Sequence, residues 1–189
     1  DYYASRGLGD VYKRQMLGTG NAMVTRCYNT CFVLSSGEEY FLVDAGGGNG
    51  IFKQLEQAGV PFTGIREMFV THAHIDHSGL LPLLYSHGFR GQIFATTATS
   101  ELCNIMLKDS AHIQMFEAEW RNRKARRAGL PEVVPLYDMD DAQGVLEHFV
   151  ACDYNKIIEI CDGVKIRFVD AGHLLGSSSI EVWLTEEDK

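Results

Sequence analysis

The sequence contains no apolar run that approaches the roughly 20 residues needed to cross a lipid bilayer. It shows no secretory signal, because no uninterrupted apolar segment follows a basic start. It also contains no internal repeat and no low-complexity linker. These absences favour a globular protein without a membrane partner and argue against a repeat architecture.

Cysteine pairs are lacking as well. The five cysteines are an odd number, and no two of them form a Cys-x-x-Cys pair. This pattern argues against a disulfide framework and against a structural zinc site built from four cysteines. We therefore expect small buried thiols, and a reducing cytoplasm as the compartment of the protein.

The chain has no overall excess of positive charge, since its formal net charge is −8 at pH 7. That balance does not favour a nucleic-acid-binding protein as a whole. Residues 121–127, however, contain five positive charges. A solvated helix end is the ordinary explanation, and a contact with a phosphate backbone is the alternative. The length of 189 residues, 46% of them hydrophobic and 22% charged, predicts one globular domain or part of a larger one.

The start of the chain differs from the rest. Residues 10–15, Asp-Val-Tyr-Lys-Arg-Gln, resemble the translation of a transposon adaptor used in sequencing libraries. The next residues, from Met16, are typical of the opening strand of a domain. We therefore interpret residues 1–15 as a non-native leader that packs poorly, and we place the domain in residues 16–189.

Apolar runs predict strands near both ends of the chain and helices between them. The expected strands, which include two hairpins, are 31–34, 40–43, 66–71, 92–96, 156–160, 164–169 and 180–184. The expected helices are 51–58, 79–86, 140–149 and a long one over 99–128 that Asp109-Ser110 could interrupt. This mixture predicts an α/β protein in which sheets pack together with helices outside.

Four potential metal ligands, His72, His74, Asp76 and His77, occupy six consecutive positions between an expected strand and an expected helix. Alternation at a strand end would point His72 and His74 to the same side, toward one ion. Asp76 and His77 would then face a second ion from the following turn. Burial of these groups without a metal would leave several of them unsatisfied. The run therefore predicts a metal site, for which imidazole suits zinc and the carboxylate also allows manganese or iron.

Two more candidates follow other expected strands. Asp44 precedes the glycine-rich segment 45–50, which lacks the Lys-Ser/Thr of a phosphate-binding loop, and its ordinary role would be a turn cap. His173 follows the strand 164–169 and is the remaining candidate for a three-nitrogen zinc site with room for water. Three other histidines have no such partners and are expected to be structural or at the surface: His87, His112 and His148.

The set formed by Asp44, the run from His72 to His77 and His173 resembles the metallo-β-lactamase superfamily of metal-dependent hydrolases, over about residues 16–189. From Asp76 onward the sequence is most similar to the RNA-processing β-CASP group, whereas the opening segment resembles ribonuclease Z-type members. The resemblance implies the N-terminal part of an αββα sandwich with mixed sheets and outer helices. It also implies that the sandwich is incomplete, without its C-terminal half and without a β-CASP domain.

The resemblance assigns roles to these residues. It implies that His72, His74 and His173 hold one zinc, and that Asp76 and His77 contribute to a second. Catalytic roles are assigned to Asp76, which would orient water, and to Asp44, which would support the ligands without binding metal. The implied function of the complete protein is a metal-dependent RNA phosphodiesterase, with RNA as partner, while this chain alone would be inactive or weakly active. The alternatives are a hydrolase of small thioesters or lactams, or of the ribonuclease Z type, and a non-catalytic metal-binding module.

Overall fold

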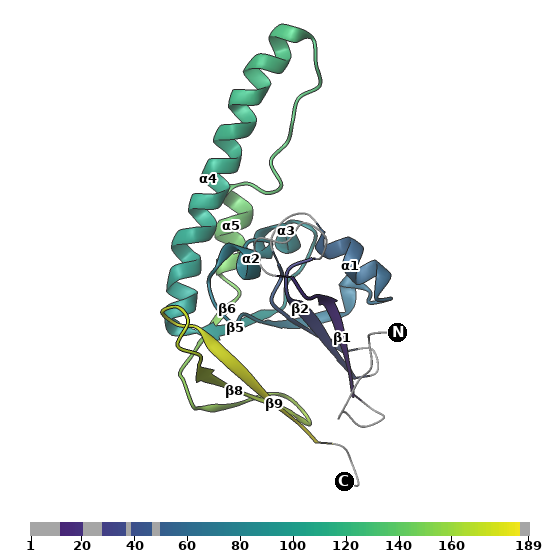
Figure 1. Ribbon diagram of the computed structural model, residues 1–189, viewed down its shortest axis with the longest axis vertical. Helices are drawn as coiled ribbons and strands as arrows, with labels where there is room; N and C mark the ends of the chain where they lie inside the picture. Colours follow the sequence, from purple (N-terminus) through teal and green to yellow (C-terminus); the bar gives the residue numbers. More distant parts are fainter. Residues whose placement is uncertain (1–11, 21–27, 37–38, 47–49, 186–189) are drawn as a thin grey trace.

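The structure is a computed structural model that describes residues 12–20, 28–36, 39–46 and 50–185. Two β-sheets lie face to face, and the helices gather on the other side of the larger sheet (Figure 1). The fold is mixed α/β, as the sequence predicts. Among the residues that the structure describes, no helix combines the length and apolar character needed to span a membrane.

The larger sheet has six strands in the order in which they occur along the chain. They are β1 (Tyr12–Gly18), β2 (Cys31–Ser36), β3 (Glu39–Val43), β4 (Ile65–Phe69), β5 (Gln92–Thr96) and β6 (Phe149–Cys152). The first three strands pair antiparallel, and β3 to β6 pair parallel. Because parallel neighbours need a crossover, the three connections between β3 and β6 carry helices.

Each crossover carries its own helices. The element α1 (Ile51–Gln57) and a short 3-10 turn (Phe62–Gly64) connect β3 to β4. The next connection contains α2 (Ile75–Ser78) and α3 (Leu81–Ser86), and the last contains α4 (Thr97–Ala128) and α5 (Met139–Leu146). The helix α4 stands out from the body of the molecule, and the segment that follows it returns alongside (Figure 1).

The smaller sheet consists of β7 (Ile157–Cys161), β8 (Val164–Asp170) and β9 (Ser178–Leu184), all antiparallel. The expected hairpin between the first two strands is confirmed, with Gly163 at a φ of 77° in its turn. This positive φ is a conformation that glycine adopts without steric cost.

Alternation along the central strands builds a core on each face of the larger sheet. Side chains toward the helices include Val33, Leu42, Met68 and Ile93, and those toward the smaller sheet include Leu34, Phe41, Phe69 and Phe94. The smaller sheet contributes Val164, Ile166 and Phe168 from alternate positions of β8 to the second core. The sandwich is therefore closed by apolar side chains from both sheets.

The expectation that the leader packs poorly is wrong for residues 12–15. They form the first half of β1, where Tyr12 is only 6% exposed and the amide of Gln15 donates a hydrogen bond of 2.9 Å to the carbonyl of Ala58. Pairing with β2 and packing against the second core hold this segment in place. Residues 1–11 lie outside the described part of the chain, and the foreign origin of the leader stays a prediction.

Three expectations about the helices also need correction. The helix expected over 79–86 begins only at Leu81, as α3, with Pro82 in its first turn, and the separate helix α2 ends before it at Ser78. The long helix α4 continues through Asp109-Ser110 without a break. The segment expected as a helix to Phe149 ends at Leu146, and Phe149 opens the strand β6, which pairs with β5.

The packing between the sheets gives a prediction about stability. Replacement of Phe168 by Ala removes a fully buried ring from the core between the sheets and should lower the free energy of unfolding by about 3–5 kcal/mol. Lys165→Ala, on the exposed side of the same strand, should change it by less than about 0.5 kcal/mol. Urea denaturation followed by circular dichroism measures both. Equal effects of the two changes would contradict the sandwich arrangement.

Candidate metal centre

The histidine segment begins where β4 leaves the sheet. The backbone N–H of Val70 still donates to the carbonyl of Phe94, but the N–H of Thr71 turns to the carboxylate of Asp44, at 2.8 Å. His72 and His74 therefore lie on an irregular segment rather than on the strand end that the sequence suggested. The sheet's ladder stops because Asp44 competes successfully for the next donor.

Asp76 and His77 lie on the single-turn helix α2 rather than on an open turn. The backbone carbonyl of His77 accepts a hydrogen bond of 2.8 Å from the N–H of Ala45, which ties this helix to the end of β3. The carboxylate of Asp76 lies 3.6 Å from Nε2 of His77. These two side chains therefore form a polar pair beside the other histidines.

Asp44 is buried at the centre of this arrangement. It is 3% exposed and adopts a positive φ of 57°, which a short polar residue tolerates. Its Oδ1 atom accepts from the N–H of Thr71, and its Oδ2 atom accepts from the hydroxyl of Thr71 and from Nδ1 of His77, both at 2.7 Å. The carboxylate thus has three partners, all from the segment that carries the histidines.

These hydrogen bonds set the tautomers of two imidazoles. The single hydroxyl proton of Thr71 goes to Asp44, so its oxygen can only accept from Nδ1 of His72, which lies 3.0 Å away. Nδ1 of His77 likewise donates to Asp44. Protonation at Nδ1 leaves Nε2 of both rings with a free lone pair, which is the form that binds a metal ion.

His173 reaches the site from the loop between β8 and β9. The hydroxyl oxygen of Ser177 accepts hydrogen bonds of 3.0 Å from the backbone N–H groups of His173 and Leu174. The next residue, Ser178, donates its own N–H to the carbonyl of Thr71 at 2.9 Å. This contact joins the loop of His173 to the segment of His72 across the two sheets.

The same loop is braced by the start of α4. The carbonyl of Gly176 accepts from the hydroxyls of Thr96 and Thr99, at 2.6 and 2.8 Å. Gly176 has a φ of 84°, and a Cβ atom there would lie 2.5 Å from the backbone nitrogen of Thr99. Only glycine allows the loop to approach the helix this closely.

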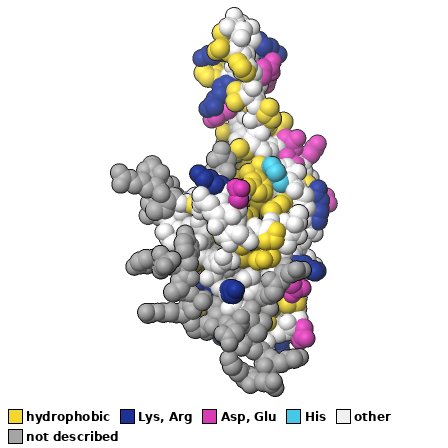
Figure 2. All heavy atoms as spheres, turned by 90° about the vertical axis from the view of Figure 1, so that its right-hand side faces the viewer, with side chains coloured by type: hydrophobic (Ala, Val, Ile, Leu, Met, Phe, Trp, Pro, Cys, Tyr) yellow, Lys and Arg dark blue, Asp and Glu magenta, His cyan; other side chains and the backbone are white. Residues whose placement is uncertain are grey.

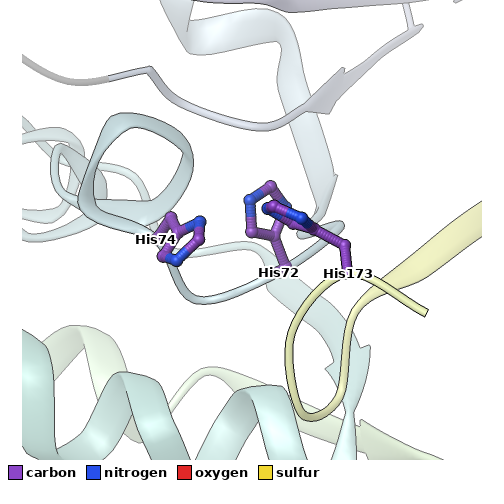
Figure 3. Close-up of side chains that lie close together, drawn as sticks. All are labelled: His72, His74 and His173. Carbon is purple, nitrogen blue, oxygen red and sulfur yellow. The ribbon is translucent and has the colours of Figure 1, made fainter. Parts of the chain in front are cut away.

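The three imidazoles of His72, His74 and His173 lie close together at the junction of their loops (Figure 3). Their ring centroids are 4.9, 5.0 and 5.1 Å apart, and one nitrogen atom from each ring lies within 4.8 Å of the others. Two ligands of a tetrahedral zinc are about 3.3 Å apart. The three rings could therefore hold one ion after a small inward shift of their side chains.

The surroundings keep His72 neutral. Burial, followed by the nearby imidazole of His77, lowers the pKa of His72 to about 4. Burial also lowers the pKa of His77, but its hydrogen bond to Asp44 and the charges of Asp44 and Asp76 outweigh this and raise it overall. An unprotonated His72 at neutral pH fits the chemistry of a metal ligand.

A pocket of about 420 Å³ adjoins the histidines. Its lining includes Asp44, His72, His77 and His173, together with the buried thiol of Cys31 and the side chain of Ile180. Burial raises the pKa of Cys31 to about 12, so its uncharged thiol lines the pocket and is not an anionic ligand at neutral pH.

The structure brings together the six positions that the sequence selected and adds others that it missed. The other described histidines have the expected structural or surface positions, since Nδ1 of His87 and of His148 contacts a backbone carbonyl and His112 is exposed. Thr71, Gly176 and Ser177 were not foreseen. The run of small residues at 176–179, three positions after His173, was the available indication of a tightly braced loop.

Comparison with known proteins places the chain. A family model described as anti-Pycsar protein Apyc1 matches residues 12–125, more than half of the sequence. The chain belongs to this family. It is also similar to curated proteins named transcription termination factor FttA, with 29% identity over 158 residues to that of Methanosarcina mazei and 28% over 165 residues to that of Thermococcus kodakarensis.

These alignments cover 79% and 81% of this chain, but it spans only 22% and 23% of the two relatives. Among solved structures, the metallo-β-lactamase MEM-A1 from a soil metagenome matches with a TM-score of 0.58 and 15% identity, over 93% of this chain and 56% of that one. The enzyme from Cronobacter sakazakii matches with a TM-score of 0.57 and 19% identity, over 89% and 51%. The expected metallo-β-lactamase fold, and the resemblance to its β-CASP group, are confirmed.

The hydrogen bonds of Asp44 give the second prediction. Asp44→Asn keeps a residue that tolerates the positive φ but removes the charged acceptor shared by Thr71 and His77. We expect the free energy of unfolding of the metal-free protein to fall by about 1–3 kcal/mol. The exposed Asp109→Asn should change it by less than about 0.5 kcal/mol. Denaturant titration compares the two, and an unchanged stability of the Asp44 variant would refute the network.

Proposed function

We propose that this chain supplies the first metal-binding part of a metal-dependent RNA phosphodiesterase. One observation carries the proposal: three imidazoles from two loops, about 100 residues apart in sequence, bring one nitrogen each to within 4.8 Å. Polar side chains that merely fill a core pair with backbone groups, as His148 does. The three converging rings instead direct donor atoms toward one another, which neutral imidazoles do around a cation.

In this proposal His72, His74 and His173 are the ligands of one zinc ion, and Asp76 and His77 are ligands of a second. Manganese or iron would fit the mixed nitrogen and oxygen donors of the second position. When bound, such ions supply a water of lowered pKa and stabilise charge on phosphate oxygens. Asp44 is a positioning residue, because it holds the ring of His77 directly, and that of His72 through the hydroxyl of Thr71, in the metal-binding tautomer.

Asp76 has a different role from Asp44. Its carboxylate is partly exposed and is near Nε2 of His77 without a close hydrogen bond, so its oxygens are available to a ligand. This carboxylate is the group that would accept a proton from an attacking water and orient it. The exposed position of His173 leaves the centre open on the side of the pocket, where an extended substrate can enter.

The similarity to these relatives favours RNA as the substrate in this proposal. Relatives that align with about four fifths of this chain are named transcription termination factors, which connects them with nascent transcripts. The chain spans about a fifth of their length, so the activity proposed here belongs to the complete reading frame that contains it. Segments beyond residues 16–189 would then complete the second metal position and clamp the strand.

Cleavage of a labelled single-stranded RNA tests the function. The protein expressed in its complete reading frame should cleave RNA with zinc or manganese and stop when EDTA removes the metal. His74→Ala should reduce the rate by about 100-fold or more, because it removes one of three ligands. The exposed His112→Ala should keep the rate within about twofold.

Two results would overturn this assignment. Robust cleavage by the His74→Ala protein would show that the histidine cluster is not the catalytic centre. Hydrolysis of a thioester or a chromogenic β-lactam, with no action on RNA, would assign the same centre to a small substrate.

A further inference from the structure

The projecting half of α4 has one covered side and one bare side. Beyond Ala111 the described contacts of the helix are with its own return segment, where the side chain of Asn122 bonds both backbone groups of Val133, at 2.7 and 2.9 Å. Two small residues, Ala118 and Ala125, are buried on that side. The opposite side of this arm lies in solvent over its whole length (Figure 1).

An aromatic and basic stripe runs along the bare side. It consists of Ile113, Phe116, Trp120, Lys124 and Arg127, which follow one another at intervals of three or four residues and so share one face. Phe116 is 65% exposed and Trp120 is 53% exposed. The ammonium group of Lys124 lies over the indole ring of Trp120, 3.6 Å from its centroid. Figure 2 shows the other side of the arm, along which the return segment runs.

The charges of the arm favour an anionic partner. Glu117 and Glu119 pair with Arg121 and Arg123 one helical turn away, which neutralises both glutamates. Arg126 pairs with Glu132 of the return segment. Lys124 and Arg127 have no carboxylate partner among the residues that the structure describes. The stripe therefore presents two cations that lack a carboxylate partner beside two exposed rings, one of which, Trp120, carries Lys124 over one face, on a chain whose net charge is −8.

Exposed aromatic rings beside cations that lack a carboxylate partner match the chemistry of a single-stranded nucleic acid. Bases stack on exposed aromatic rings whatever their sequence, and cations contact the phosphates between them. An acidic protein segment would use the cations but would gain less from the stacked rings. We propose that the stripe on α4 is a docking surface for single-stranded RNA, which rests on the proposed function and assigns the substrate strand a second contact.

The helix links this surface to the metal centre. Thr99, in its first turn, holds the loop of His173 through Gly176, and Trp120 lies 21 residues further along the same unbroken helix. At 1.5 Å per residue this separation is roughly 30 Å. A strand held at both places must be long enough to span that distance, so short oligonucleotides would lose the contact with the arm.

Binding of a labelled single-stranded RNA of about 30 nucleotides, measured by fluorescence anisotropy, tests the proposal. The His74→Ala form of the 189-residue chain is used in EDTA, so that neither cleavage nor metal contributes. Lys124→Glu with Arg127→Glu should weaken binding by about tenfold at low salt and lower the salt slope by about 1.4. Trp120→Ala should weaken binding by about fivefold or more through lost stacking.

A matched charge reversal elsewhere provides the control. Lys13→Glu with Lys53→Glu changes the net charge equally on exposed positions of β1 and α1 and should leave binding within about twofold. Equal loss in the control and the arm variants would overturn the proposal, because it would reveal unspecific attraction. Unchanged RNA binding by the arm variants would also overturn it, and a simultaneous change of oligomeric state would assign the stripe to a protein partner. Failure of the cleavage test leaves this binding measurement unaffected, so the two proposals fail separately.

Discussion

The carboxylate of Asp44 is the constraint on which the site depends. A buried charge costs several kcal/mol unless hydrogen bonds compensate it, and in the described part of the chain the compensation comes from Thr71 and His77. The same three bonds end the β4 ladder, fix the path of the histidine segment and set the tautomers of two rings. One buried carboxylate thereby fixes the backbone between β4 and α2 and orders the imidazole nitrogens that could bind a metal.

A second set of contacts brings His173 to this segment. Ser178 pairs with the backbone of Thr71, and Gly176 places its carbonyl against the first turn of α4. Since the two sheets share a core that includes Phe168, the loop above that core cannot move far from the end of β4. Packing of the sandwich and geometry of the histidines are therefore parts of one arrangement.

Local patterns foretold much of this structure. The apolar runs of β2 and β3 around their turn and the Asp162-Gly163 turn are short-range features, and they predicted the two hairpins correctly. The spacing of the histidines selected side chains that the structure brings together, and their role as ligands stays a prediction. These short-range features did not predict the elements that depend on contacts between distant residues. The four-residue strand β6 is too short for a periodic signal, and residues 12–15 belong to β1 only because β2 lies beside them.

The site likewise has features that the sequence predicts and features that depend on long-range contacts. The side chains of His72, His74 and His173 could be named from the motif and the resemblance, but the role of Thr71 depends on which donor Asp44 captures in three dimensions. The spacing of residues along the sequence does not reveal which backbone N–H will bond to Asp44. Likewise the long helix α4 was expected, whereas the bare side of its outer half follows from where the return segment packs.

The most direct test of the central claim is anomalous diffraction at the zinc edge, from crystals of the chain grown with zinc. The account predicts a peak about 2.1 Å from one ring nitrogen of each of His72, His74 and His173. A zinc-loaded crystal without a peak among these three rings, or with a peak held by other residues, would contradict it.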